Sequence, residues 1–280
     1  MWDAKILDRN LHMNLHEKIR NDLVDSLKTA EDDKISQLNN SLRLLAKWRS
    51  VLIQNTVLQN EGTIVSGGPF KGMQFLEHSA EGCHIAKLLG CYEQPLFEHL
   101  EKVFSSNFKV VLNIGCAEGY YAVGMARRMP EANILAFDTN TQAQVACQKL
   151  AAANGVSDRI QIGGKFEPKD FSLFDDPMTL VLCDIEGAEL ELLQPSLAES
   201  LKKKSIIVES HECLRAGITN TLISRFGESH DIIQVSDNGF REIPNVPQWF
   251  KNLSHLDQLL ATWEWRSGPT PWLVMKPKSC

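Results

Sequence analysis

The sequence predicts an α/β fold in which a doubly wound, mostly parallel sheet of seven strands carries helices on both faces. Two observations support this prediction. Short apolar runs alternate with helical segments from residue 110 onward, the pattern of parallel strands joined by crossover helices. The run at 110–114 breaks into a glycine-bearing turn that opens a helix, and the next run ends in Asp138. This order of parts is typical of a Rossmann-like nucleoside-binding domain.

The first 60 residues are expected to form an N-terminal helical extension. Apolar residues recur at helical spacing on both sides of an acidic break at 31–33, so two amphipathic helices are predicted. These helices would form either a cap on the core or a dimerisation arm that produces a homodimer. The repeated residues are Leu11, Leu15, Ile19, Leu23 and Leu27, then Ile35, Leu38, Leu42, Leu45 and Leu52, with Arg49 interrupting the second series.

Residues 61–105 are expected to lead into the core. Paired glycines within 62–82 indicate a β-hairpin or an ordered loop, and a helix is predicted at about 94–104. The glycine-rich stretch lacks the G-K-[ST] ending and the strand–helix context of a phosphate-binding loop.

The remaining residues, 106–280, are expected to form the main domain, with a long non-helical segment before the last strand. A last strand that follows a non-helical segment, rather than a crossover helix, fits an antiparallel strand inserted at the sheet edge. An aromatic-rich insertion at about 241–270 would either line a substrate site or pack on the N-terminal helices. Strands are predicted at 110–114, 133–138, 159–163, 178–183, 205–209, 231–236 and 272–276, and helices at 119–129, 141–153, 187–200 and 216–227.

Composition excludes several classes of function. The net charge of −6 is mild and spread out, so neither nucleic acid nor an anionic membrane is an expected partner. No window of about 18 apolar residues predicts a membrane-spanning helix. The seven cysteines form no C-x-x-C pair, and the N-terminus lacks the order of a signal peptide. We therefore expect a cytoplasmic protein.

The glycine turn indicates which nucleoside cofactor is bound. Gly115, Ala117 and Gly119 give G-x-A-x-G rather than the G-x-G-x-x-G of dinucleotide enzymes. Glu118 would repel a diphosphate but suits a ligand with an ammonium group, such as S-adenosylmethionine. Asp138 is placed to accept hydrogen bonds from the ribose hydroxyls. Gly164 and Lys165 follow the third strand, where they would either lie beside the adenine ring or form only a turn.

With these residues, the chain resembles the FkbM type of class I S-adenosylmethionine-dependent methyltransferases over about residues 66–240. The motifs are the glycine turn from Asn113 to Gly119, the acid Asp138, Asp184-Ile-Glu-Gly-Ala-Glu189, and Glu209-Ser-His211. The resemblance implies methyl transfer to an oxygen of a small molecule or sugar. It also implies that Asn113, Gly115, Ala117, Glu118, Gly119, Asp138, Gly164, Lys165 and Asp184 bind the cofactor.

One residue departs from the family pattern. Most members carry an acid where this chain has Asn113, which can accept a hydrogen bond but brings no charge to the cofactor's ammonium. Glu118 is the nearby acid that could supply the charge.

Asp184, Glu209 and His211 are the candidate catalytic residues, because the carboxyl ends of parallel strands face the ligand crevice. Three interpretations stay open. The three side chains could hold a divalent metal such as Mg²⁺ that binds the acceptor hydroxyl. His211 could instead act as a metal-free general base, oriented by Asp184 or Glu209. The segment could also be structural, with Glu186 and Glu189 at the start of a helix.

Two other functions compete with methyl transfer. One is a non-catalytic cofactor-binding or assembly module that works through its N-terminal helices. The other is a nicotinamide-dependent oxidoreductase, against which the turn from Gly115 to Gly119 argues. The sequence after the fourth strand, at Asp184, lacks the N-P-P-Y of enzymes that methylate a nucleobase amine.

Overall fold

The computed structural model describes residues 9–28, 33–77, 82–243 and 246–278, with the backbone alone described for 9–14. The chain divides into two compact units. One comprises Met1–Gly62 and Val246–Thr262, and the other comprises Thr63–Asn245 and Trp263–Cys280. The segment at 63–105 thus shares a unit with the sheet, and part of the aromatic-rich insertion shares a unit with the N-terminal helices. The side chain of Leu11 and the acids at 31–32 lie outside the described residues.

The first unit is built on two helices, α1 (Arg9–Lys28) and α2 (Lys34–Glu61). Both predicted N-terminal helices are therefore confirmed. Asp33 caps α2, since its side chain accepts a hydrogen bond from the backbone N–H of Ile35 at 3.0 Å. No helix in the described part of the chain is long and apolar enough to cross a membrane.

Two further helices of this unit, α9 (Gln248–Lys251) and α10 (His255–Thr262), were not predicted. The expectation of a non-helical segment before the last strand is therefore wrong. α10 packs against α2, where Asp257 accepts two hydrogen bonds of 2.6 Å from Arg49. Arg49, which interrupts the apolar series of α2, thus faces a carboxylate that only the tertiary fold supplies.

The second unit begins with a short hairpin-like loop, as expected, in which Ile64 and Gln74 form an antiparallel bridge. The predicted helix at 94–104 is present as a 3₁₀ turn at Gln94–Leu96 followed by α4 (Phe97–Phe104). Between the loop and this turn lies α3 (His84–Leu89), which was not predicted. Its six residues are all buried, so no amphipathic pattern marks it.

Seven strands of the described residues form one sheet in the order β3-β2-β1-β4-β5-β7-β6. Neighbouring strands pair in parallel except β7, which is antiparallel to both β5 and β6. The Rossmann-like fold expected for a class I methyltransferase is confirmed, including the antiparallel last strand, although β7 lies one position inside the edge strand β6. The strands are β1 (Val110–Ile114), β2 (Asn133–Phe137), β3 (Ile160–Gly163), β4 (Thr179–Cys183), β5 (Ser205–Glu209), β6 (His230–Val235) and β7 (Trp272–Pro277).

Helices cover both faces of this sheet. α5 (Tyr120–Arg128), α6 (Thr141–Ala153) and α8 (Ile218–Phe226) lie where the sequence predicts them. The expected helix at 187–200 is wrong, because only α7 (Glu189–Leu192) forms. Pro195 explains this difference, since it has no backbone N–H to donate and its ring clashes with the preceding turn.

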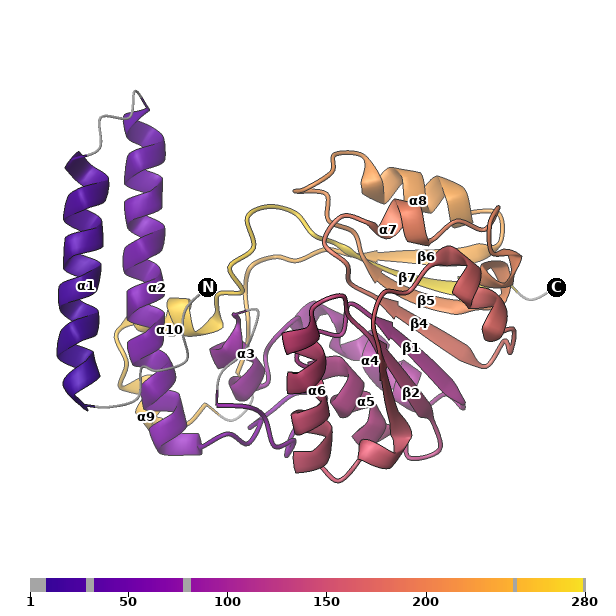
Figure 1. The fold of residues 1–280 in the computed structure, drawn as a ribbon, viewed down its shortest axis with the longest axis horizontal. Coiled ribbons are helices and arrows are strands. Elements are labelled where there is room, and N and C mark those ends of the chain that lie inside the picture. Colours follow the sequence, from indigo (N-terminus) through magenta and orange to yellow (C-terminus); the bar gives the residue numbers. More distant parts are fainter. Residues whose placement is uncertain (1–8, 29–32, 78–81, 244–245, 279–280) are drawn as a thin grey trace. The chain divides into compact units, whose positions relative to one another are not determined.

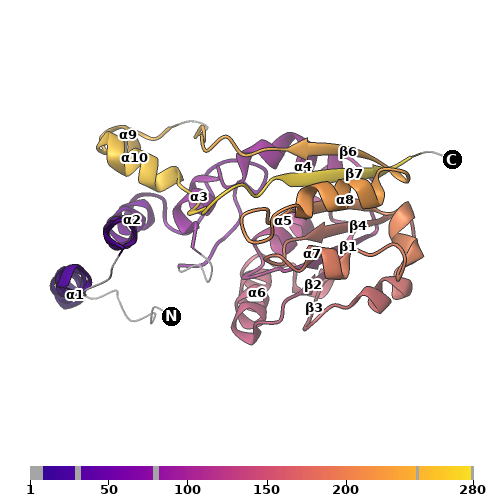
Figure 2. The same ribbon diagram turned by 90° about the horizontal axis from the view of Figure 1, so that it is seen from above.

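The two faces of the sheet carry different side chains, because alternate residues of a strand point to opposite faces. Leu112 and Ile114 of β1 join the apolar core that contains Leu222 and Phe226 of α8. Asn113, between them, therefore points to the opposite face. Figure 1 shows α7 and α8 on one side of the sheet and α4, α5 and α6 on the other. Figure 2 shows the labelled strands running from β6 at one edge to β3 at the other.

Candidate active site

The glycine turn after β1 is held against the end of β4. A Cβ on Gly115 would lie 1.6 Å from the carbonyl oxygen of Asp184, so this close approach requires glycine. A Cβ on Gly119 would lie 2.6 Å from Sγ of Cys147 on α6, and Gly119 also has a φ of 93°. Both glycines therefore have packing reasons for their identity, in addition to any role toward a ligand.

Asp138 follows β2 and its carboxylate is fixed at both oxygens. Oδ2 accepts a hydrogen bond from the backbone N–H of Ala117 at 2.9 Å, and Oδ1 accepts one from the N–H of Asn140 at 2.8 Å. A carboxylate oxygen has a second lone pair, so each can also accept from a hydroxyl. Ala117 thus takes part through its backbone, in the positioning of Asp138.

A cavity of about 450 Å³ lies at the carboxyl ends of β1, β2, β3 and β4. This volume is within the range of small-molecule sites, and the position is where parallel sheets bind ligands. Lys165 at its rim forms an ion pair of 3.3 Å with Glu167. Of the residues expected to bind the cofactor, Gly115, Asp138, Gly164, Lys165 and Asp184 line this cavity.

Glu118 and Asn113, which the sequence predicts as cofactor contacts, both lie in the protein interior. Glu118 is fully buried, and its Oε1 forms an ion pair of 2.7 Å with Nζ of Lys87 on α3. Its charge is therefore balanced inside the protein. Asn113 is 1% exposed, and among the described residues its Oδ1 has no hydrogen-bond partner. Neither residue lines the cavity of about 450 Å³.

A second cavity, of about 220 Å³, adjoins the first. Asp184 and Glu186 line both cavities, and Glu209 and His211 line the second. The three predicted catalytic residues are thus brought together at one place, where the two cavities meet.

His211 is the centre of this junction. Its Nδ1 is 2.7 Å from Oε1 of Glu189, which is buried and bonds this nitrogen. Its Nε2 is 3.4 Å from Glu186 and 3.5 Å from each of Asp184 and Glu209. With Nδ1–H donated to Glu189, Nε2 is the nitrogen that faces the cavity. Glu189, expected only as a helix residue, therefore orients the imidazole.

The carboxylates around His211 favour its charged form. Burial lowers the pKa of His211, but the hydrogen bond to Glu189 and the charges of Glu209, Glu189 and Glu186 outweigh burial and raise the pKa above its ordinary value. The junction is thus built to accept a positive charge, either a proton on Nε2 or a bound cation.

The donor atoms that could share a metal ion differ in one residue from the predicted set. Ligand atoms of Asp184, Glu186 and His211 all lie within 4.8 Å of one another. Glu209 is instead hydrogen-bonded through Oε1 to the guanidinium of Arg266. Two carboxylates and an imidazole nitrogen suit a divalent ion, so the residues present fit a metal, with Glu186 in the place expected for Glu209.

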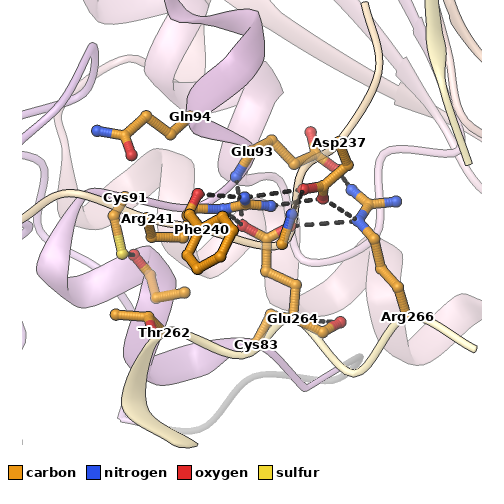
Figure 3. A network of polar contacts seen from close by, with 12 residues as sticks. Cys83, Cys91, Glu93, Gln94, Asp237, Phe240, Arg241, Thr262, Glu264 and Arg266 are labelled. Carbon is orange, nitrogen blue, oxygen red and sulfur yellow. Dashed lines mark hydrogen bonds and ion pairs between the residues drawn. The ribbon is translucent and has the colours of Figure 1, made fainter. Parts of the chain in front are cut away.

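Behind the second cavity lies a buried network of acids and guanidinium groups, shown in Figure 3. Arg266 forms ion pairs with Glu93 at 2.9 Å, Asp237 at 3.1 Å and Glu264 at 3.3 Å. Arg241 binds Asp237 at 2.6 Å and is also bonded to Glu264. Burial, followed by the charge of Glu209, raises the pKa of Glu93 to about 8.

Sequence reasoning missed this network. Its members come from the segment before α4, the end of β6 and the aromatic-rich insertion, so no local motif contains them. The local signals were two pairs of opposite charges, Glu264 with Arg266 beside two tryptophans, and Asp237 with Arg241 four residues later.

No known family profile matches the chain, and no curated protein matches it. Among solved structures, the O-methyltransferase TomG from Streptomyces achromogenes in complex with SAM is 14% identical, with a TM-score of 0.45, covering 66% of this chain and 80% of that one. Cofactor-bound Rv0187 from MTB is 12% identical, with a TM-score of 0.45 and coverage of 92% and 95%. A putative O-methyltransferase from Klebsiella pneumoniae is 12% identical, with a TM-score of 0.43 and coverage of 94% and 97%. With TM-scores below 0.5, these similarities do not identify a function.

Proposed function

We propose that this protein transfers the methyl group of S-adenosylmethionine to a hydroxyl oxygen of a small molecule or sugar. One observation carries this proposal. A nucleoside-sized cavity and a polar cavity meet at Asp184 and Glu186, and the Nε2 atom of His211 lies within 3.5 Å of both carboxylates. A methyl donor in the first cavity and an acceptor in the second would therefore have their reacting atoms at the same place.

The first cavity has features that suit the cofactor. Asp138 is pre-oriented by two backbone N–H groups and would accept the ribose hydroxyls. Gly164 has nothing nearer to an added Cβ than the side-chain amide of Gln144 at 4.0 Å, so a ring can pass close to its backbone. When bound, S-adenosylmethionine supplies an electrophilic methyl group, and the protein's contribution is to align the acceptor.

His211 is the group that would take the acceptor's proton. Glu189 holds the proton on Nδ1, so the lone pair of Nε2 faces the junction and can receive the hydroxyl proton as the oxygen attacks. Asp184 and Glu186 would stabilise the imidazolium that results. Such general-base catalysis contributes about 10²- to 10⁴-fold to rate.

A divalent cation is a second candidate for activating the hydroxyl. Asp184, Glu186 and His211 would hold it, and it would lower the pKa of an oxygen bound to it. The observation that favours this alternative is the convergence of two carboxylates on Nε2, whose tautomer is the one found in metal-bound histidines.

The finer assignments are also proposals. The Asp184–Glu189 and Glu209–His211 motifs support membership in the FkbM type. The free thiols of Cys83, Cys116 and Cys147 support a reducing, cytoplasmic location. The exposed residues Ile35, Leu38, Leu42 and Leu45 of α2 support a homodimer through the N-terminal helices.

The proposed function is tested with the full chain and methyl-labelled S-adenosylmethionine against a panel of hydroxylated small molecules. Label on an oxygen supports it, and loss of transfer with a chelator, restored by Mg²⁺, selects the metal route. Binding of the cofactor without transfer to any acceptor would favour a non-catalytic module. Binding of NAD(H) without binding of S-adenosylmethionine would favour an oxidoreductase.

A further inference from the structure

The second cavity is lined by more negative than positive groups. Its described lining contains the carboxylates of Asp184, Glu186, Glu209 and Glu264. The permanent cations in that lining are Lys87 and Arg266. The lining by itself therefore carries four acids against two bases.

Both of these cations are shared with acids outside the lining. Nζ of Lys87 is 2.7 Å from Glu118. Arg266 forms an ion pair of 3.1 Å with Asp237, one of the contacts drawn in Figure 3. They are thus less available to balance the carboxylates that face the cavity.

The network behind the cavity leaves the excess of negative charge in place. Arg241 is 2% exposed and is bonded to Asp237 and Glu264. Glu93, whose pKa is raised to about 8, is protonated and uncharged at neutral pH, so it adds neither a negative nor a positive charge. A proton on His211 would be balanced by Glu189, to which its Nδ1 is bonded.

Aromatic rings line the same cavity. Tyr92 and Trp265 are both part of it, and Nζ of Lys87 already lies 4.9 Å from the ring centroid of Tyr92. Carboxylates together with aromatic rings are the combination that recognises ammonium groups. The same lining disfavours a phosphate or carboxylate, because it would place like charges together in a partly buried space.

We propose that the acceptor is a hydroxylated small molecule that carries a positively charged amine, such as an amino sugar or an amino alcohol. This inference rests on the proposed function and adds the charge of the substrate to it. The hydroxyl would lie at Asp184 and His211, where the cavities meet, and the ammonium group among the remaining carboxylates. Acceptors that carry a phosphate or a carboxylate are disfavoured.

The experiment measures binding of three probes to the full chain saturated with the unreactive product S-adenosylhomocysteine. The probes are glucosamine, glucose and glucuronate, which share a ring and differ in charge, at one fixed ionic strength. We expect glucosamine to bind roughly tenfold or more tightly than glucose, and glucuronate more weakly than both, as one charge contact in a partly buried site implies. In the Glu186→Gln variant the preference for glucosamine over glucose should fall to about threefold or less. The matched control is Glu199→Gln, an exposed acid outside the cavity, which should keep the full preference.

The outcomes separate the inference from the proposed function. Failure of S-adenosylhomocysteine to bind would count against the proposed function itself. Cofactor binding with no preference for glucosamine, or with no binding of glucosamine, would overturn the inference alone. If added Mg²⁺ abolished the preference and a chelator restored it, the carboxylates would belong to a metal rather than to the acceptor's amine, which would also overturn it.

Discussion

The two cavities of the sheet domain are neighbours of opposite character. The first is formed by turns that follow four adjacent strands, and Phe137 and Phe166 give it an apolar wall with ring centroids 4.8 Å apart. The second combines acids and bases that come from segments as distant in sequence as Lys87 and Arg266. The first cavity is therefore formed by the fold itself, whereas the second depends on side chains that are particular to this chain.

The two cavities also differ in the function that we propose for each. A cofactor common to many enzymes needs the cavity that the fold provides, and specificity for an acceptor needs residues added to the fold. Asp184 lines both cavities, so it lies where the proposed cofactor site and the proposed acceptor site meet.

The variant His211→Asn should distinguish the functions of the two cavities most clearly. Removing the proposed base from the second cavity should lower kcat about 10²- to 10⁴-fold. Binding of S-adenosylmethionine in the first cavity should change little. Single-turnover methyl transfer and calorimetry measure the two effects, and His99→Ala, a histidine of α4 away from the cavities, serves as the control. A parallel loss of cofactor affinity would show that the two cavities cannot be separated in this way.

The next largest effect concerns Glu118, which the sequence predicts as a cofactor contact and which forms a buried ion pair with Lys87 in the structure. Glu118→Gln removes the carboxylate that forms a buried ion pair with Lys87, so the free energy of unfolding should fall by about 3–5 kcal/mol. The double variant Lys87→Met with Glu118→Leu should recover much of this loss. Denaturant unfolding measures both, and an undiminished stability of Glu118→Gln combined with weak cofactor binding would restore the ligand role.

Asp138→Ala tests the first cavity alone. Loss of a hydrogen bond from hydroxyls to a charged group is worth about 1.5–3 kcal/mol, so the Kd for S-adenosylmethionine should rise about 10- to 150-fold. The control is Asp158→Ala, an exposed acid before β3 that does not line the cavity. Unchanged affinity by calorimetry would remove the ribose assignment.

The last effect is a pH dependence that comes from the network behind the second cavity. Glu93 has a folded pKa of about 8 against an ordinary value of 4.5, so the folded state holds its proton over a range where the unfolded state has lost it. This contribution to stability is fully present below pH 4.5 and is lost as pH rises through 8. The unfolding free energy should fall over that window, and Glu93→Gln should flatten the curve while the exposed Glu98→Gln does not. A wild-type curve that rises from pH 5 to 8.5 would contradict this.

The sequence predicted the sheet well because strands and turns are local. The β-α alternation and the antiparallel last strand could be read from short apolar runs between turn residues. Helix predictions were wrong where a single residue ended the helix, as at Pro195. They also failed where full burial removed the amphipathic pattern, as in α3.

The site was predicted in part for the same reason. Asp138, Asp184, Glu209 and His211 end strands, and strand ends are brought together by the topology alone. Glu189 and Arg266 could not be assigned from sequence, because their roles depend on which side chain lies opposite. The partner of Glu118 is in α3, a helix that itself gave no signal, and so its burial could not be foreseen.

A crystal structure of the full chain with S-adenosylhomocysteine would show whether the two cavities serve a single methyl transfer. We predict the nucleoside in the cavity of about 450 Å³, with the ribose hydroxyls on Asp138 and the sulfur directed toward Asp184, where the second cavity begins. A nucleoside bound outside that cavity, or one whose sulfur points away from Asp184 and His211, would contradict the claim that the two cavities serve a single methyl transfer.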